Sequence, residues 1–494
     1  MNPFRKLAGD TAIYGMSSII GRFLNWWLVP YYSFMFLPEE YGVVANLYAY
    51  AALLLVLLTY GMETTFFRFA SKSENPGQVY ATSLISLVFT SLSFILVVVA
   101  FRHPIAAAIG YPDNPEYILW FSLILGMDAF TSIPFARLRL NNRPLKFALI
   151  KLINIAFNIG FNLFFISLCP RILESNPESF IRHLYSPEIG VGYVFISNLL
   201  ASLITLLLLI PEIFRFSWEF NRKLLMQMYH YGFPILIVGL AGMVSQNIDK
   251  VFIPFLVPDK QNPMFQLGIY GANFKLAVLM NMFIQAFRYA FEPFFFSREN
   301  SKEDPHVYAT VMKYFVIFGL LIFLGMVLYL DLIKVIIDSK YHEGLKVVPI
   351  ILMGNLFYGI YFVLSLWYKL KDMTRYGAYM ALTGAAITIV INLLFVPHYG
   401  YIGSAVAIFV SFFTMMILSW YWGQKFFPIP YNLKRIGFYF LVAALLFGFS
   451  RLTHHQQPLI KYPFHTLFIL IFLVFVYVYE KSDLIHLFKG KKKK

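Results

Sequence analysis

The sequence has only one cysteine, Cys169, among its 494 residues. A single cysteine excludes an intramolecular disulfide and leaves no thiolate pair for a metal or redox site. The sequence also lacks a Walker loop, a His or Cys set at metal-ligand spacing, and a nucleophile beside a base. We therefore expect no metal ion, no cofactor and no enzymatic activity.

Charged residues are scarce as well. They make up 13% of the chain, against 59% hydrophobic residues, and the mean hydropathy is +0.67. A soluble domain of this length cannot bury so much apolar surface, so the lipid bilayer must be the solvent for most of the chain.

Apolar runs long enough to cross a ~30 Å hydrocarbon layer recur along the whole sequence. The predicted spans are 11–36, 42–67, 79–101, 116–135, 146–168, 189–211, 231–257, 267–293, 308–329, 345–367, 376–396, 401–423, 434–450 and 462–480. The first run lacks a small-residue cleavage pattern, so we expect an uncleaved span and not a signal peptide. The sequence predicts an all-α polytopic membrane protein with about 14 transmembrane helices.

The basic residues set the expected orientation. With the N-terminus inside, 24 Lys and Arg fall on inner segments and 9 on outer connections. The outer set is Arg102, Arg171, Arg182, Lys260, Lys334, Lys340, Lys346, Arg451 and Lys461. Both termini should therefore be cytoplasmic, and the net charge of +15 is a topology signal, not a nucleic-acid footprint. The basic C-terminal tail fits contact with anionic membrane lipids or a plain topology anchor.

Two parts of the sequence repeat. Residues 136–165 align without gaps onto 366–395, with Asn162 matching Asn392, and "PEIGVG" (187–192) then matches "PHYGYI" (397–402). "YGVVANLYAYAALL" (41–54) likewise resembles "LGIYGANFKLAVLM" (267–280). Two six-helix copies in the same orientation would be related by an axis along the membrane normal. We expect an N-terminal lobe at 1–215, a C-terminal lobe at 216–428, and two additional helices with a basic tail at 429–494; chance similarity between apolar helices is the alternative.

Most polar residues of the spans form stripes on helix faces. Spacings of three and four residues place these side chains on one face: Tyr14, Ser18, Arg22 and Asn25 in the first span, and Lys151, Asn154, Asn158 and Asn162 in the fifth. An ionised side chain facing lipid costs at least ~2.5–3.5 kcal/mol at the bilayer centre. These stripes should therefore line a central cavity between the lobes.

Each charge also has a simpler explanation. Lys151 can snorkel to the interface, Arg288 can pair with Glu292 four residues on, and the asparagines of the fifth span can join helices. Asp128 is either the partner of a buried cation or a protonatable group, and Asp249 with Lys250 can form an interfacial pair. Arg22, about 16 Å into its span, is either a functional group or half of an ion pair.

The deep charges are mostly positive, because Arg22, Lys151, Lys275 and Arg288 outnumber the deep acids. A planar guanidinium suits bidentate phosphate binding, and a low-dielectric cavity strengthens the attraction. The expected cargo is anionic.

Two elements of the sequence carry a resemblance to a known family. The first is "EEYGVVANLYAYAALLLVLLTYGMETTFFRF", around the second span, with Glu40, Tyr41, Gly42, Gly61, Phe67 and Arg68, and the second is the element Asn392, Leu393, Phe395, Pro397, Gly400, Gly403, Ser404 and Ala405. With these elements the chain resembles bacterial polysaccharide-export flippases, which are the Wzx-like members of the multidrug/oligosaccharidyl-lipid/polysaccharide (MOP) exporter superfamily.

The resemblance implies a V-shaped, two-lobed monomer in the bacterial inner membrane. It would move an undecaprenyl-pyrophosphate-linked oligosaccharide from the inner to the outer leaflet by alternating access. The expected substrate-binding residues are Arg22, Asn25, Lys151, Lys275 and Arg288. Coupling to H⁺ or Na⁺ is a family expectation, with Asp128 and Asp249 as candidates.

Three alternatives stay open at this level. A lipid II flippase of the same fold fits the helix count equally well. A multidrug or cation antiporter would need a carboxylate-rich pocket, against the basic balance seen here. A membrane polysaccharide polymerase or glycosyltransferase usually carries a large outer loop, whereas the longest outer connection here is 169–188.

Overall fold

The computed structural model describes residues 3–214, 219–296, 305–452 and 456–489, and within these it describes the side chains of 19–288 and 305–481. Every regular element in the described ranges is helical. The long helices are α1 (Pro3–Met35), α2 (Pro38–Thr59), α4 (Pro76–Ala100), α6 (Pro115–Leu140), α7 (Pro144–Asn162), α9 (Gly192–Phe214), α10 (Arg222–Leu256), α11 (Pro263–Leu276), α12 (Val278–Phe296), α13 (Pro305–Leu328), α15 (Val348–Leu364), α17 (Arg375–Tyr399), α18 (Tyr401–Phe426), α19 (Leu433–Leu452) and α20 (Pro458–Lys489).

Short elements join or extend these helices. They are α3 (Met62–Ala70), α5 (Arg102–Ala108), a π-helical turn η1 (Leu163–Leu168), α8 (Cys169–Ser175), η2 (Phe180–His183), η3 (Pro187–Ile189), η4 (Asp259–Gln261), α14 (Leu330–Ile333), η5 (Lys334–Ile336), η6 (Ser339–Val347) and α16 (Leu366–Leu370).

Each predicted span falls on a helix, but two spans are interrupted. The span predicted at 42–67 breaks between α2 and α3, where Tyr60 and Gly61 take left-handed φ angles of 34° and 71°. Glycine adopts this conformation without strain, which explains the break. The span at 267–293 bends by 40° between α11 and α12.

Twelve helices in the described residues are long and apolar enough to cross a membrane, and thirteen if the bent pair α11–α12 counts as one span. A polytopic all-helical membrane fold is therefore confirmed, while the expected number of 14 spans is not.

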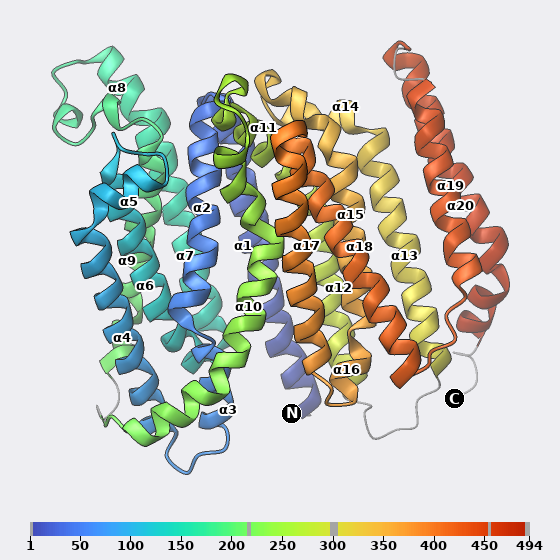
Figure 1. The fold of residues 1–494 in the computed structure, drawn as a ribbon, viewed down its shortest axis with the longest axis horizontal. Helices are drawn as coiled ribbons and strands as arrows, with labels where there is room; N and C mark the ends of the chain where they lie inside the picture. Colours follow the sequence, from blue (N-terminus) through green and yellow to red (C-terminus); the bar gives the residue numbers. More distant parts are fainter. Residues whose placement is uncertain (1–2, 215–218, 297–304, 453–455, 490–494) are drawn as a thin grey trace. The chain divides into compact units, whose positions relative to one another are not determined.

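The chain divides into two compact units (Figure 1). Unit 1 comprises residues 1–272 and 388–401, and unit 2 comprises 273–387 and 402–494. In unit 1, α6 packs against α4 and α9, α7 packs against α9 and α1, and α10 packs against α2. In unit 2, α13 packs against α15, α19 and α20. The division into lobes at 215 and 428, which rests on the repeat, stays a prediction.

The repeat has a matching local geometry. The turns before α7 and α17 contain Asn142 and Asp372, which are 230 residues apart and have φ angles of 50° and 53°. In the first turn the next N–H donates to the carbonyl of Leu138 at 2.9 Å, and in the second to that of Tyr368 at 2.8 Å. These turns have the same hydrogen bonds as well as the same backbone conformation.

Two further matched positions agree. Asn162 and Asn392 each donate from Nδ2 to the carbonyl four residues earlier, both at 2.7 Å. Gly190 and Gly400, which follow the two matched asparagines, both take positive φ, at 49° and 55°. Agreement in backbone conformation is independent of residue hydrophobicity, so it supports duplication over chance similarity of apolar helices.

Candidate transport and ion sites

Arg22 lies on the exposed side of α1. The preceding residue, Gly21, faces α7 so closely that a β-carbon there would lie 2.7 Å from Ile155 Cδ1. Successive helical residues differ by about 100° around the axis, so Arg22 points away from that contact. Arg22 and Asn25 are both exposed, and neither forms a hydrogen bond or ion pair within the described side chains. Tyr14 and Ser18, the rest of this predicted stripe, lie outside the described side chains.

Asp128 and Lys151 line one polar cavity of about 470 Å³ inside unit 1. Asp128 Oδ1 accepts a hydrogen bond of 2.9 Å from Ser202 on α9, and the Lys151 ammonium lies 4.1 Å from the centre of the Phe135 ring. The polar residues of the cavity wall are Thr59, Glu63, Asp128, Thr131, Ser132, Arg139, Lys151, Asn154, Asn198, Ser202 and Thr205. The structure thus brings a carboxylate from α6 and an ammonium from α7 to one polar cavity.

An ion pair lies at one end of this cavity. Arg139, near the end of α6, pairs with Glu63 of α3, and its guanidinium lies 4.9 Å from the centre of the Phe67 ring. The orientation predicted from the basic residues would put this end of α6 on the cytoplasmic side. Glu63 lies on α3, after the break at Tyr60 and Gly61, so its pairing with Arg139 depends on the course of the chain after that break.

The asparagines on α7 join helices. Asn154 donates to the Ala201 carbonyl at 3.0 Å and to Thr205 Oγ1 at 2.8 Å, which ties α7 to α9. Asn162 accepts from the Tyr32 hydroxyl of α1 at 2.8 Å. These contacts support helix packing as the role of these two side chains.

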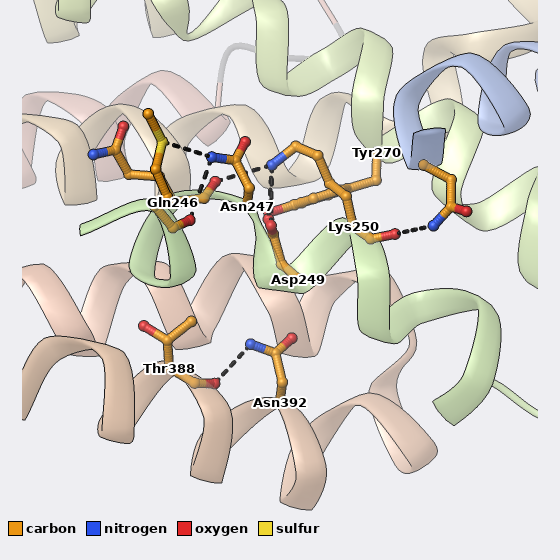
Figure 2. Close-up of polar contacts among 9 residues, drawn as sticks. Gln246, Asn247, Asp249, Lys250, Tyr270, Thr388 and Asn392 are labelled. Atoms are coloured by element: carbon orange, nitrogen blue, oxygen red, sulfur yellow. Dashed lines mark hydrogen bonds and ion pairs between the residues drawn. The ribbon is translucent and has the colours of Figure 1, made fainter. Parts of the chain in front are cut away.

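Asp249 is fully buried on α10, and its carboxylate accepts three hydrogen bonds from two donor groups (Figure 2). The Lys250 ammonium donates to Oδ1 and Oδ2 at 3.0 and 3.1 Å, and the Tyr270 hydroxyl donates to Oδ2. Lys250 also donates to the Gln246 carbonyl at 3.2 Å. The pair foreseen for these neighbours is present, but in the core of unit 1. A buried carboxylate so fully occupied has little capacity left for a transported ion.

Lys275 and Arg288 belong to unit 2. Lys275 is exposed at the end of α11, next to the bend. The Arg288 guanidinium lies 4.7 Å from the centre of the Phe362 ring, and the Lys369 ammonium lies 4.6 Å from the centre of the same ring. Two cations on one aromatic ring concentrate positive charge at this place. The Glu292 side chain lies outside the described ones, so its proposed pairing with Arg288 is not addressed.

The roles assigned to Arg22, Asn25, Lys151, Lys275 and Arg288 in substrate binding stay a prediction, as do the coupling roles of Asp128 and Asp249. Several polar residues of the unit 1 cavity were not foreseen: Asn198, Ser202 and Thr205. They are four and three residues apart on α9, and this is the spacing that placed the polar residues of the first span on one helix face. In the parts of the chain described, no three His, Cys, Asp or Glu gather as a metal site.

Long apolar helices with a polar cavity among them are typical of polytopic membrane transporters. The sequence matches the family described as "Polysaccharide biosynthesis protein" over residues 7–298, which is more than half of the chain. The protein therefore belongs to this family, and the resemblance to Wzx-like members of the MOP superfamily is confirmed.

Solved structures show the same fold. A lipid II flippase MurJ in an inward closed conformation matches with a TM-score of 0.74 at 15% identity, covering 96% of this chain and 99% of that one. An inward-facing multidrug resistance MATE family transporter matches with a TM-score of 0.63 at 13% identity, covering 84% and 94%. A MOP superfamily transporter from Pyrococcus furiosus matches with a TM-score of 0.54 at 13% identity, covering 85% and 95%. A search of curated protein sequences found no match.

Proposed function

We propose that the protein moves an undecaprenyl-pyrophosphate-linked oligosaccharide from the inner to the outer leaflet of the bacterial cytoplasmic membrane. It acts as a monomer, by alternating access, with both termini in the cytoplasm. Membership in a polysaccharide biosynthesis family with a transporter fold supports this proposal.

The observation that carries the proposal is the exposure of the Arg22 side chain. Its charge lies within a long apolar helix, on the exposed side, without an ion pair in the described side chains. A guanidinium at mid-membrane depth that faced lipid would cost at least ~2.5–3.5 kcal/mol, so it needs water or an anionic ligand beside it. The pyrophosphate of a lipid-linked sugar offers the bidentate oxygens that this group binds best.

We assign ion coupling to Asp128 in preference to Asp249. Asp128 opens onto a cavity with room for water, and its carboxylate accepts a hydrogen bond from Ser202. Asp249 instead holds Lys250 and Tyr270 in a closed cluster. We propose H⁺ as the coupling ion, because one carboxylate is enough to take up a proton, whereas a bound metal cation needs several oxygen ligands around it.

The substrate is tested in a gene-deletion strain by measuring surface glycan and the lipid-linked intermediate. The deletion should remove the glycan and accumulate the intermediate, and the wild-type gene should reverse both. Arg22→Ala should fail to restore export while still reaching the membrane, and Arg22→Lys should restore part of it. Arg182→Ala, in an exposed connection, is the matched control and should export normally. Normal export by Arg22→Ala would remove the main support for the proposal.

A lipid II flippase is the second candidate. Its support is the match to MurJ, which covers 96% of this chain and therefore includes at least part of the two additional helices, α19 and α20. Rescue of a strain depleted of its lipid II flippase would favour this alternative, and failure to rescue, together with restored glycan in the deletion strain, would exclude it.

A further inference from the structure

Four of the nine basic residues on the predicted outer connections surround a single pocket in unit 2. Lys334, Lys346, Arg451 and Lys461 line a pocket of about 340 Å³. It forms where the end of α13, the short helices α14 and η6, the end of α19 and the first turns of α20 meet; Figure 1 shows α14 at this end of α13. Outer connections are otherwise poor in Lys and Arg, so this concentration is not explained by topology.

The charges at this pocket do not cancel. Its acidic residues are Asp331 and Glu343, which leaves a net charge of +2 with the histidines neutral. Asp331 is shared between two lysines, since it accepts from Lys334 at 2.8 Å and from Lys461. Glu343 lies 3.4 Å from Lys346, and both side chains are about half exposed. Such an exposed ion pair contributes little to the stability of the fold, so an anionic ligand can readily replace Glu343 as the partner of Lys346.

Two histidines fix the wall of the pocket. His342 Nε2 lies 3.0 Å from the Lys334 carbonyl oxygen and donates to it, and His465 Nδ1 donates to the Leu328 carbonyl at 2.6 Å. His465 and Lys461 are both buried on α20. These hydrogen bonds hold the backbone that carries the basic side chains in a fixed position.

Arg451 completes the pocket from the end of α19. Its guanidinium lies 4.9 Å from the centre of the Phe447 ring, and the side chain is exposed. Stacking on an aromatic ring leaves the N–H groups at the edge of the guanidinium plane available to a phosphate.

Apolar side chains flank this basic pocket. Leu332, Val335, Leu452 and Leu459 are 50%, 71%, 75% and 86% exposed. Exposed apolar side chains close to a cationic pocket suit contact with lipid tails. The combination of a cationic pocket with an apolar surround matches an amphiphile with a phosphate head.

We propose that this pocket binds the headgroup phosphate of an anionic glycerophospholipid at the outer end of unit 2. Arg451 and Lys346 contact the phosphate, Lys334 and Lys461 supply long-range attraction while holding Asp331, and the acyl chains lie along the exposed apolar side chains. The site is separate from Arg22 and does not depend on which cargo the protein carries.

The proposal is tested on the purified full-length protein in detergent, by native mass spectrometry and thermal unfolding with added lipid. Phosphatidylglycerol should remain bound and raise the melting temperature of the wild type, whereas phosphatidylcholine should do so far less. The double variant Arg451→Gln/Lys346→Gln should bind phosphatidylglycerol about 30-fold more weakly, from about 1 kcal/mol for each basic side chain. Arg451→Lys with intact Lys346 should retain most of the affinity.

Lys340→Gln is the matched control, because Lys340 is an exposed outer lysine that does not line the pocket. It should bind phosphatidylglycerol like the wild type. Equal binding by the wild type and the double variant, or equal loss in Lys340→Gln, would overturn the proposal. Inorganic phosphate that stabilises the wild type as strongly as the lipid does would overturn the lipid assignment and identify free phosphate as the ligand.

Discussion

Gly42 and Gly268 occupy matched positions of the internal repeat. Gly42, on α2, contacts the backbone at the start of α11, and Gly268, on α11, contacts the backbone at the start of α2. A β-carbon at Gly268 would overlap the carbonyl oxygen of Pro38, and one at Gly42 would overlap that of Met264. Both contacts lie within unit 1. The beginnings of α2 and α11 can approach this closely only because both positions lack a side chain.

Gly268→Ala should lower the melting temperature of the purified protein. The neighbouring atom belongs to the backbone, so relief requires a shift of a helix start, and overpacking of this kind costs about 1–3 kcal/mol. Thermal unfolding in detergent measures the effect. Gly242→Ala on α10 is the control, since a β-carbon there meets nothing within 4 Å and should be neutral or stabilising. Equal melting temperatures for Gly268→Ala and the wild type would contradict the close contact.

The paired turns at Asn142 and Asp372 give a second prediction. Valine in a left-handed conformation costs about 1–2 kcal/mol, because its Cβ crowds the following carbonyl. Asn142→Val and Asp372→Val should therefore lower the melting temperature by similar amounts, and Asn142→Gly should not. Asn141→Val is the matched control, since Asn141 has φ of −83°. A large loss in only one of the two turns would argue that they are not equivalent.

The hydropathy pattern located the helices because a helix that crosses a bilayer needs a long apolar segment, and each predicted span has one. The break at Tyr60–Gly61 was not foreseen, because a hydropathy pattern carries no information on φ. The sequence likewise marked Asp128 and Lys151 separately, as charges within predicted spans, but their shared cavity depends on how α6 and α7 pack.

Ion pairs show the same limit. The pair of Asp249 with Lys250 was foreseeable because the residues are neighbours. The buried pair of Lys313 with Glu480 joins residues far apart in the sequence, from α13 and α20, and no local pattern predicts it. Partners of this kind follow from tertiary packing, and a single sequence does not reveal which distant charges meet.

Asp128→Asn should uncouple transport from the proton gradient. The amide can still accept from Ser202 but cannot take up a proton, so a pH gradient should no longer drive transport and the rate should fall at least about tenfold. Substrate movement in proteoliposomes, with and without an imposed pH gradient, measures this. Ser132→Ala, another cavity-wall residue, is the control and should remain gradient-dependent. A gradient-driven rate that Asp128→Asn leaves intact would exclude Asp128 as the coupling group.

Asp249→Asn should instead reduce stability. Removing one partner of a buried ion pair leaves the Lys250 charge uncompensated, at a cost of about 3–5 kcal/mol. The melting temperature and the amount of folded protein should both fall. Asp249→Asn/Lys250→Met removes both charges and should recover most of the loss. A stable Asp249→Asn protein with lost gradient dependence would reverse the assignment of the two aspartates.

Asp331 predicts a pH dependence outside the membrane spans. Burial opposes its ionised form, but hydrogen bonds from Lys334 and Lys461 outweigh burial and lower the pKa of Asp331 from 3.8 to about 2. A depressed folded-state pKa stabilises the fold above the unfolded value, and this contribution is lost as the pH falls from about 4 through about 2. The shift corresponds to about 2 kcal/mol at most, and solvent screening of a quarter-exposed side chain reduces this to about 1 kcal/mol.

The test compares melting temperatures of the wild type and Asp331→Asn between pH 5 and pH 2. The wild type should lose more stability than Asp331→Asn across this window, and the gap between the two should narrow toward pH 2, where about half of the Asp331 carboxyl groups are protonated. Asp113→Asn, which removes an exposed carboxylate from another connection, should follow the wild type. If Asp331→Asn instead loses as much stability as the wild type between pH 4 and pH 2, the lysine-held carboxylate is not the acid-sensitive group.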